Sequence, residues 1–268
     1  ERSLNVDFLL GILKRILERR HDLKVVIASA TMDTAKFAEF FNAPIINVPG
    51  RLFPIDIRYR ASEDDSETDL AEAVAGAIRE LPDEGDVLVF LSGERDIRDC
   101  GEHLDTVFGG RYEIIPLIAS LPAAEQRRAF RLSSRRRIVL ATNVAETSVT
   151  IPGIRAVIDS GLARISRYVH RTQVQRLQIE PISQASARQR AGRCGRLGPG
   201  TCIRLYSEED FLKRDAYTAP EVLRSSLAGV ILTMLDLRLG NIESFPFIDP
   251  PKPAMVREGL KELLELGA

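Results

Sequence analysis

The sequence predicts an α/β protein in which a parallel sheet carries helices on both of its faces. Short apolar segments without polar alternation, such as residues 86–91 and 137–141, are typical of strands that are buried on both faces. Helical patterns separate these segments regularly, and such alternation favours a parallel sheet. With 268 residues, 44% of them hydrophobic, the chain is long enough for one large or two ordinary domains.

The first fifty residues have the pattern of the last units of an α/β domain. An apolar stripe with helical spacing predicts an amphipathic helix at residues 5–20. Apolar runs predict strands at residues 24–28 and 45–48, with a helix at residues 33–41 between them. Because these strands lack sheet neighbours, we expect residues 1–50 to be poorly packed or to pair with another molecule.

A second α/β domain follows, in which the alternation of strands and helices continues. The expected strands lie at residues 53–60, 86–91, 112–117, 137–141, 156–159 and 201–206. The expected helices lie at residues 68–81, 94–108 and 122–131. An arginine-rich segment at residues 162–182 interrupts the alternation, and its pattern predicts a projecting β-hairpin. Two further helices are expected at residues 221–239 and 256–266, on either side of a proline-rich break.

One octet, Gln189 to Arg196, places three arginines and a glutamine within eight residues. If a helix runs from about Ser183 through the octet, Gln189, Arg193 and Arg196 project from one face, and Arg190 points elsewhere. Guanidinium groups pair bidentately with phosphate oxygens, so this row suits a polyanion such as a triphosphate. A solvated basic helix end is the ordinary alternative for a run of arginines.

Charge is distributed unevenly along the chain. The net charge is −1, but residues 127–204 hold sixteen arginines and three acidic residues, so this third carries +13 and the rest −14. A basic middle indicates an anionic partner. The three cysteines have no paired metal spacing, which favours a reducing compartment. No apolar run approaches ~18 residues, so we expect no membrane span and a cytoplasmic protein.

Three segments lie at the carboxyl ends of predicted strands, at residues 29–31 (Ser-Ala-Thr), 90–93 (Phe-Leu-Ser-Gly) and 141–150 (Ala-Thr-Asn-Val-Ala-Glu-Thr-Ser-Val-Thr). Together with the octet, and in this order, they resemble the later motifs of DEAH-box ATP-dependent RNA helicases of superfamily 2. The resemblance covers essentially the whole chain and is closest to the bacterial HrpA type. Residues 1–5 resemble those that directly follow the family's Asp-Glu-Ala-His box, so we expect the chain to be a fragment.

The resemblance implies a domain organisation. Residues 1–50 are expected to be the end of a first RecA-like lobe. Residues 51–215 are expected to be a complete second RecA-like lobe with the hairpin at residues 162–182. Residues 216–268 are expected to be the truncated start of a winged-helix domain. The missing N-terminal lobe would then be a partner of this chain.

The resemblance also implies a nucleotide site that binds ATP with Mg²⁺. Gln189, Arg193 and Arg196 are expected to face the γ-phosphate, with the arginines acting as fingers for transition-state charge. Phe130 is expected either to stack on adenine or to be a core aromatic residue of its helix. Thr150 is expected near the nucleotide. The metal ligands are expected outside this chain.

For RNA, the resemblance implies contacts with the sugar-phosphate backbone, mainly of single strands. Such contacts suit small hydroxyl and amide side chains, although these residue types also cap helices and close turns. The residues expected to contact RNA are Ser92, Gly93, Thr142, Asn143 and Thr147. Those expected to couple ATP hydrolysis to the grip on RNA are Ser29 and Thr31. The hairpin is expected to part strands or steer RNA, with His170 as an exposed basic residue.

Departures from the family pattern limit the expected activity. Pro152 stands where many members carry an Asp that contacts the ribose, which argues against tight selection of base or sugar. The sequence has no Gly-Lys dipeptide, and the Asp-Glu pair at residues 83–84 precedes a strand. We therefore expect the parent protein to couple ATP hydrolysis to translocation on RNA or its unwinding, and the isolated chain not to hydrolyse ATP. Two alternatives stay open: a non-catalytic nucleic-acid-binding module, and a degenerate helicase-like scaffold.

Overall fold

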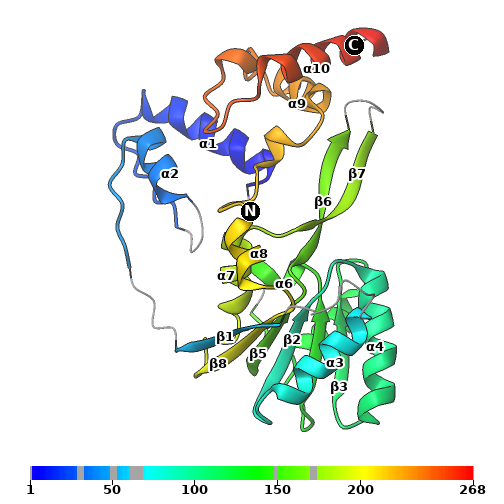
Figure 1. Ribbon diagram of the computed structural model, residues 1–268. Helices are drawn as coiled ribbons and strands as arrows, with labels where there is room; N and C mark the ends of the chain where they lie inside the picture. Colours follow the sequence, from blue (N-terminus) through cyan, green and yellow to red (C-terminus); the bar gives the residue numbers. More distant parts are fainter. Residues whose placement is uncertain are drawn as a thin grey trace. The chain divides into compact units, whose positions relative to one another are not determined.

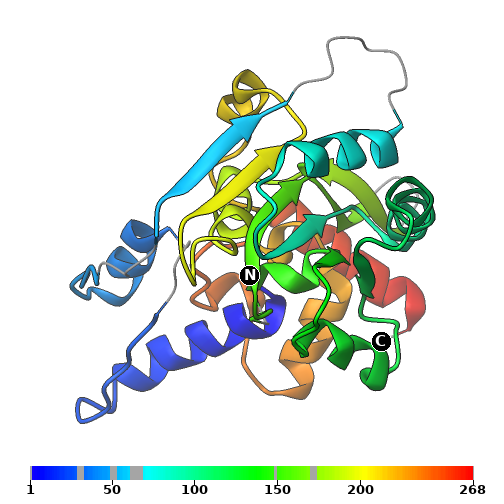
Figure 2. The ribbon, with the colours of Figure 1, turned by 90° about the horizontal axis from the view of Figure 1, so that it is seen from below.

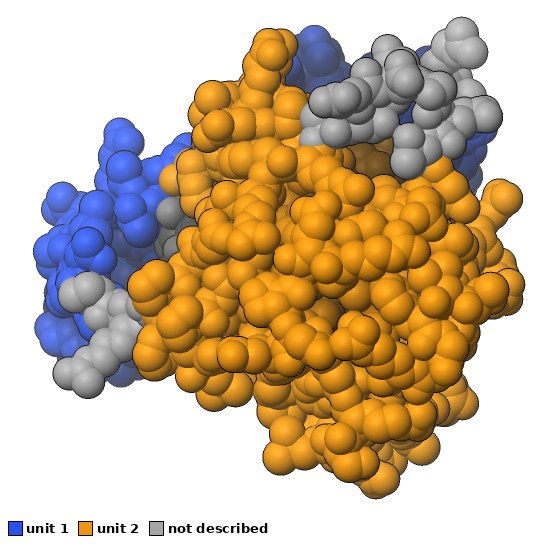
Figure 3. Space-filling view, turned by 60° about the horizontal axis from the view of Figure 1, so that its bottom comes forward, with its two compact units in different colours: residues 1–48, 165–178, 218–268 blue, residues 49–164, 179–217 orange. Residues whose placement is uncertain are grey.

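The computed structural model describes residues 2–28, 33–48, 53–60, 69–147, 150–169 and 174–267, and the side chain of Thr147 is not among the described atoms. The chain forms two compact units, which Figure 3 shows in different colours. Unit 1 comprises residues 1–48, 165–178 and 218–268, and unit 2 comprises residues 49–164 and 179–217.

Unit 2 is built on a six-stranded sheet with the order β1-β8-β5-β2-β4-β3. Every neighbouring pair is parallel, as β1 and β8 illustrate in Figure 2. The strands are β1 (Ile55–Tyr59), β2 (Asp86–Phe90), β3 (Glu113–Leu117), β4 (Arg137–Ala141), β5 (Ile154–Asp159) and β8 (Gly200–Arg204). The predicted parallel sheet is confirmed, and all six strands overlap the segments expected from the sequence.

Helices cover both faces of this sheet because successive side chains of each strand point to opposite sides. In β2, Val87 and Val89 belong to the core under helices α3 (Leu70–Glu80) and α4 (Glu94–Phe108). Leu88 and Phe90 belong to a second core that includes residues of α6 (Val144–Thr147) and α7 (Gln184–Ala191). Two separate cores explain why these strands have no polar alternation.

The expected hairpin is present as a separate two-stranded sheet of β6 (Leu162–Val169) and β7 (Val174–Pro181), visible in Figure 1. Helix α8 (Glu208–Lys213) follows β8 and was not predicted from the sequence. Its N-cap is Ser207, whose hydroxyl accepts the Asp210 N–H at 3.0 Å.

Unit 1 contains four helices within its described residues: α1 (Leu4–Leu17), α2 (Thr34–Phe41), α9 (Leu227–Asp236) and α10 (Pro253–Leu266). Phe8 of α1 packs edge-on against Phe245 with ring centroids 5.9 Å apart, in a core that also includes residues of α9 and α10. Gly259 lets α10 approach α9 closely, since a Cβ there would lie 2.9 Å from the Ala228 nitrogen. None of the described helices is long and apolar enough to cross a bilayer.

The strands expected at residues 24–28 and 45–48 are not formed in the structure. Val26 is 90% exposed and Ile46 is 81% exposed, so neither segment is buried in a sheet. The physical reason is the missing neighbour: an isolated apolar strand has no partner for its backbone groups. The expectation of poor packing is confirmed for these two segments, whereas the adjacent α1 packs into the core of unit 1.

Two predicted helices are shorter than expected. The helix expected at residues 122–131 is one α-helical turn, α5 (Ala123–Gln126), followed by the 3₁₀ turn η1 (Arg127–Phe130). The helix expected at residues 221–239 is divided into the 3₁₀ turn η2 (Glu221–Leu223) and α9. It breaks because Ser226 acts as an N-cap, with its hydroxyl accepting the Ala228 N–H at 3.2 Å.

Candidate functional site

The ends of β2 and β4 bring two predicted RNA-binding segments together. These strands are parallel neighbours, with Phe90 opposite Ala141, and the Leu91 N–H donates to the Ala141 carbonyl at 2.9 Å. The segments that leave the two strands therefore start side by side at the carboxyl edge of the sheet. Ligands of open α/β sheets bind at this edge.

The first segment is the turn at Ser92 and Gly93, just before α4. Ser92 is buried, and its hydroxyl donates to the carboxylate of Asp96 in the first turn of α4. Gly93 is covered by an arginine that sequence analysis did not single out: a Cβ on Gly93 would lie 2.7 Å from Nε of Arg164. Arg164 is exposed and adds a positive charge beside this turn, which suits an anionic backbone.

The second segment is Thr142 and Asn143, which precede α6. Their carbonyl groups accept the N–H groups of Ala145 at 3.2 Å and Glu146 at 3.0 Å. Thr142 is half-buried and Asn143 is exposed. The backbone of Thr147 ends the same short helix. Four of the five expected RNA-contacting residues therefore lie on two adjacent strand ends.

The arginine octet does not form one continuous helix, so this prediction is wrong. Helix α7 begins after its N-cap Ser183 and ends at Ala191, with Gly192 as its C-cap. Arg193 and Arg196 lie in the turn beyond the helix, and helical spacing does not place them. Gly195 is needed there because a Cβ would lie 2.8 Å from side-chain atoms of Ile55.

Arg190, the first arginine of the octet, is fully buried and points into unit 2. It donates to Asp159 at 2.7 Å and to Glu146 at 3.2 Å, and its guanidinium lies 4.8 Å from the ring centre of Phe90. Burial alone lowers the pKa of Arg190, but the two carboxylates outweigh this effect and the pKa is raised. Arg190 is therefore a structural ion-pair residue and not a ligand-facing one.

Arg193 and Arg196 converge on one small pocket, whose floor is formed by apolar residues of β2, α6 and β5. Arg193 donates to the backbone carbonyl of Glu146, and Arg196 donates to the Thr150 hydroxyl at 2.6 Å. Burial, and then the nearby charge of Arg196, lower the pKa of Arg193. Three residues expected at the nucleotide, Thr150, Arg193 and Arg196, are thus brought together, although Thr150 and Arg196 are 46 residues apart in the sequence.

Glu146 links the octet to the segment that follows β4. Its carboxylate accepts hydrogen bonds from Arg190 and, at 2.6 Å, from the Ser186 hydroxyl on α7. Its carbonyl accepts the bond from Arg193. Sequence analysis missed this role, and also that of Asp159, because the partners are 31 to 47 residues apart. The only available signal was an acidic residue inside an otherwise basic third of the chain.

The other expected residues are less closely associated. Gln189 is half-buried on α7, and Phe130 is half-buried against the core beneath η1. Pro152 offers its carbonyl to the buried guanidinium of Arg137 at 2.6 Å. Two expectations lie outside the described residues: the coupling roles of Ser29 and Thr31, and the exposure of His170.

The family model described as "Helicase conserved C-terminal domain" matches residues 69–198. The chain is 57% identical over its whole length to the ATP-dependent RNA helicase HrpA of Escherichia coli K12, of which it covers 21%. It is 55% identical to the HrpA homolog of Haemophilus influenzae, of which it also covers 21%. It is 43% identical to the human probable ATP-dependent RNA helicase DHX34, of which it covers 25%. The chain thus spans about a fifth to a quarter of the length of these relatives.

Solved structures of E. coli HrpB resemble the chain along its whole length. One, described as a DExH-box NTPase, gives a TM-score of 0.88 at 35% identity, and the chain covers 34% of it. Another, described as a DEAH/RHA helicase, gives the same TM-score. The six-stranded parallel sheet with helices on both faces is the RecA-like fold that the resemblance implied. The chain therefore contains the conserved C-terminal domain of helicases, and over its whole length it is similar to one part of the HrpA-type RNA helicases.

Proposed function

We propose that this chain is the central part of an ATP-dependent RNA helicase that couples ATP hydrolysis to translocation on RNA or to its unwinding. The observation that carries the proposal is the convergence of Arg193 and Arg196 on one small pocket, with Arg196 also donating to the Thr150 hydroxyl. Two guanidinium groups held close together repel each other, and an anion between them relieves this repulsion. A phosphate group has the charge and the oxygen acceptors for that position.

In this proposal, Arg193 and Arg196 stabilise the charge that develops on the γ-phosphate, and Gln189 contacts the same group. Arginine fingers of related NTPases raise turnover by on the order of 10³-fold or more. Phe130 supplies a partly exposed ring for adenine, while the rest of its ring stays against the core. The phosphate cradle and the Mg²⁺ ligands would come from a first RecA-like lobe outside this chain. Bound Mg²⁺ would neutralise phosphate charge there.

The carboxyl edge of the sheet is proposed to hold the RNA backbone. Ser92, Gly93, Thr142, Asn143 and Thr147 are the proposed contacts, and small polar groups at strand ends suit contacts that carry no sequence information. Ser29 and Thr31 would couple the grip on RNA to the state of the nucleotide. Closure of two lobes around ATP would then move this edge relative to the other lobe.

The domain limits and the location in the cell are proposals as well. Residues 1–50 would end the first RecA-like lobe, residues 51–215 would form the second lobe, and residues 216–268 would begin a winged-helix domain. The full protein would act in the cytoplasm without a membrane partner. The isolated chain would not hydrolyse ATP, and RNA-stimulated ATP turnover by this polypeptide alone would contradict that statement.

The test is the substitution Arg193→Ala in the full-length parent protein, with Arg188→Ala as a matched control on the exposed side of α7. We expect Arg193→Ala to lower ATP turnover by about 10³-fold while RNA affinity changes by less than about threefold. A non-catalytic binding module predicts the reverse pattern, and a degenerate scaffold predicts no turnover in the unmodified parent. Turnover is measured by phosphate release with saturating RNA, and affinity is measured by fluorescence anisotropy at fixed salt.

A further inference from the structure

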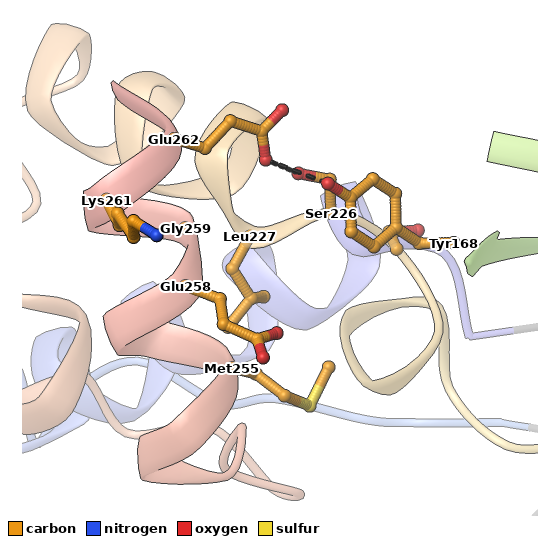
Figure 4. Close-up of a pocket in the computed structure, with 9 residues that line it drawn as sticks. Tyr168, Ser226, Leu227, Met255, Glu258, Gly259, Lys261 and Glu262 are labelled. Carbon is orange, nitrogen blue, oxygen red and sulfur yellow. Dashed lines mark hydrogen bonds between the residues drawn. The ribbon is translucent and has the colours of Figure 1, made fainter. Parts of the chain in front are cut away.

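Unit 1 contains a pocket of about 180 Å³ between α10 and the start of α9, with Tyr168 of β6 opposite α10 (Figure 4). Glu262 in its wall accepts the Tyr168 hydroxyl at 3.0 Å and the Ser226 hydroxyl at 3.1 Å. The ammonium group of Lys261 lies 3.6 Å from Glu265 on the same helix. These charges are engaged within unit 1, so the pocket does not by itself indicate a ligand.

Unit 2 contains a buried ion pair whose bonds reach further. Arg137, the first residue of β4, is 1% exposed and lies 2.6 Å from Asp86, the first residue of β2. A guanidinium group has five N–H donors. Two of them bind the Asp86 carboxylate, and the other three bind backbone carbonyl groups. These carbonyls belong to Ala129, Arg131 and Pro152.

The three carbonyl groups lie in two segments that flank the proposed nucleotide site. One segment is the 3₁₀ turn η1, in which Phe130 stands between the two residues that accept bonds from the guanidinium. The other segment precedes β5. There, Pro152 comes two residues after Thr150 and directly after Ile151, which lines the small pocket of the two octet arginines. One guanidinium therefore connects the proposed base side of the site to its phosphate side.

The surroundings of the ion pair favour a role in geometry. Replacement of a buried ion pair by apolar residues is often neutral or stabilising, so stability alone does not explain a buried arginine. The planar guanidinium holds several acceptors in one fixed arrangement, which a point charge does not do. Gly153 leaves room for the pair, since a Cβ there would lie 2.5 Å from Asp86. Its carbonyl also accepts the Asp86 N–H at 2.9 Å, so the loop before β5 is held by both partners.

We propose that Arg137 is a positioning residue for nucleotide binding. It fixes the turn that carries Phe130 relative to the loop that carries Thr150, and so sets how much the adenine base adds to affinity. Arg137 acts through these segments and does not touch the nucleotide, because its donors are occupied by protein acceptors. The inference rests on the proposed nucleotide site and extends it to a residue behind that site.

The test compares two ligands of the full-length parent protein by titration calorimetry in the presence of Mg²⁺. AMP-PNP, an ATP analogue that resists hydrolysis, reports the base and the phosphates together. Tripolyphosphate reports the phosphates alone. The readout is the ratio of the two dissociation constants. Loss of folded protein lowers the titration stoichiometry but leaves this ratio unchanged, so a folding defect is distinguished from a displaced base site.

Two substitutions of Arg137 are compared with a matched control. Arg137→Lys keeps a charge beside Asp86 but has a single nitrogen, which cannot reach all three carbonyls. Arg137→Met removes every side-chain donor. We expect each to weaken AMP-PNP binding by about tenfold, within the range for stacking of one base on an aromatic ring, and tripolyphosphate binding by less than about twofold. The control is Arg136→Lys, because the Arg136 guanidinium binds residues 82–85 in the loop before β2. It should leave both constants unchanged.

The variant Phe130→Leu, which removes the ring, separates the inference from the proposed function. Selective weakening of AMP-PNP by Phe130→Leu and by both Arg137 variants supports the inference, and the double variant Phe130→Leu/Arg137→Lys should then bind no more weakly than Phe130→Leu. If only Phe130→Leu has this effect, the inference is overturned and the proposed site remains. If Phe130→Leu leaves the ratio unchanged, or the unmodified protein does not bind AMP-PNP, the proposed adenine site and the inference fail together. Equal weakening of both ligands by Arg137→Lys also overturns the inference.

Discussion

Replacement of Arg190 by Met tests whether the octet, beyond its proposed role at a ligand site, stabilises the second unit. The guanidinium of Arg190 is fully buried and pairs with two carboxylates, Asp159 and Glu146, which are also buried. Methionine keeps most of the apolar volume beside Phe90, so the substitution removes mainly the charge and its hydrogen bonds. Among the described residues, Asp159 then retains the bonds from the Gly161 N–H and the Tyr206 hydroxyl.

The expected loss of stability follows from this arrangement. Removal of one partner from a buried ion pair costs about 3–5 kcal/mol, because the remaining charge stays out of water without compensation. Two carboxylates lose their partner here, so we place Arg190→Met at the upper end, near about 5 kcal/mol. The control is Arg188→Met, two residues away on the exposed side of α7, with an expected loss below about 1 kcal/mol.

Stability is measured by urea unfolding followed by far-UV circular dichroism, since the chain has no tryptophan. Hydrogen exchange of the β2 and β5 amides assigns the loss to unit 2. Adding Asp159→Asn to Arg190→Met removes one of the two buried carboxylates that have lost their arginine partner, and is expected to recover part of the stability. Equal effects of Arg190→Met and Arg188→Met, or no recovery in the double variant, would refute the reasoning.

Three further outcomes are expected. Burial raises the pKa of the Cys100 and Cys194 thiols to about 12, so iodoacetamide at pH 8 should label them only as fast as the protein unfolds. The stability that these two thiols contribute is complete below about pH 8.5 and is lost as the pH rises toward 12. A urea midpoint that stays unchanged between pH 8 and pH 10.5 would contradict this expectation. Gly153→Ala should lower the free energy of unfolding by at least about 1 kcal/mol more than Gly110→Ala does, as measured by thermal unfolding. Both glycines have positive φ, but only a Cβ on Gly153 would meet Asp86, at 2.5 Å. Equal losses of stability in the two variants would exclude this clash. Thr150→Val removes the acceptor of an exposed hydrogen bond and should lower the free energy of unfolding by less than about 1 kcal/mol, as measured with urea. In the parent protein, the same substitution should lower ATP turnover. Unchanged turnover would exclude Thr150 from the proposed site.

The secondary structure could be predicted wherever a pattern was local. Helix α4 was placed with both of its ends correct, because a glycine precedes it and another follows it around a strongly amphipathic segment. The helix expected at residues 221–239 failed, since a serine cap inside an apolar run cannot be distinguished locally from an exposed helical serine. The strands expected at residues 24–28 and 45–48 have strand composition, but a strand also needs a neighbour that the local sequence does not reveal.

The candidate site could be predicted where it depends on sheet topology. Ser92 and Thr142 follow neighbouring strand ends because parallel strands end at the same edge, and the order of elements was enough to predict that edge. The position of Arg193 and Arg196 was predicted from helical spacing, which is wrong because the helix stops at Ala191. The inward role of Arg190 could not be assigned, since its two acidic partners become neighbours only after the chain has folded.

The position of Glu146 has a mechanical consequence for the second unit. Its side chain is anchored to α7, and its backbone oxygen holds Arg193, while its own segment leaves the end of β4 beside Ser92. The two edges proposed for phosphate and for RNA are therefore joined through one short helix of four residues, α6. We therefore expect a displacement of one edge to be passed to the other through this helix and the two residues that link it to β4.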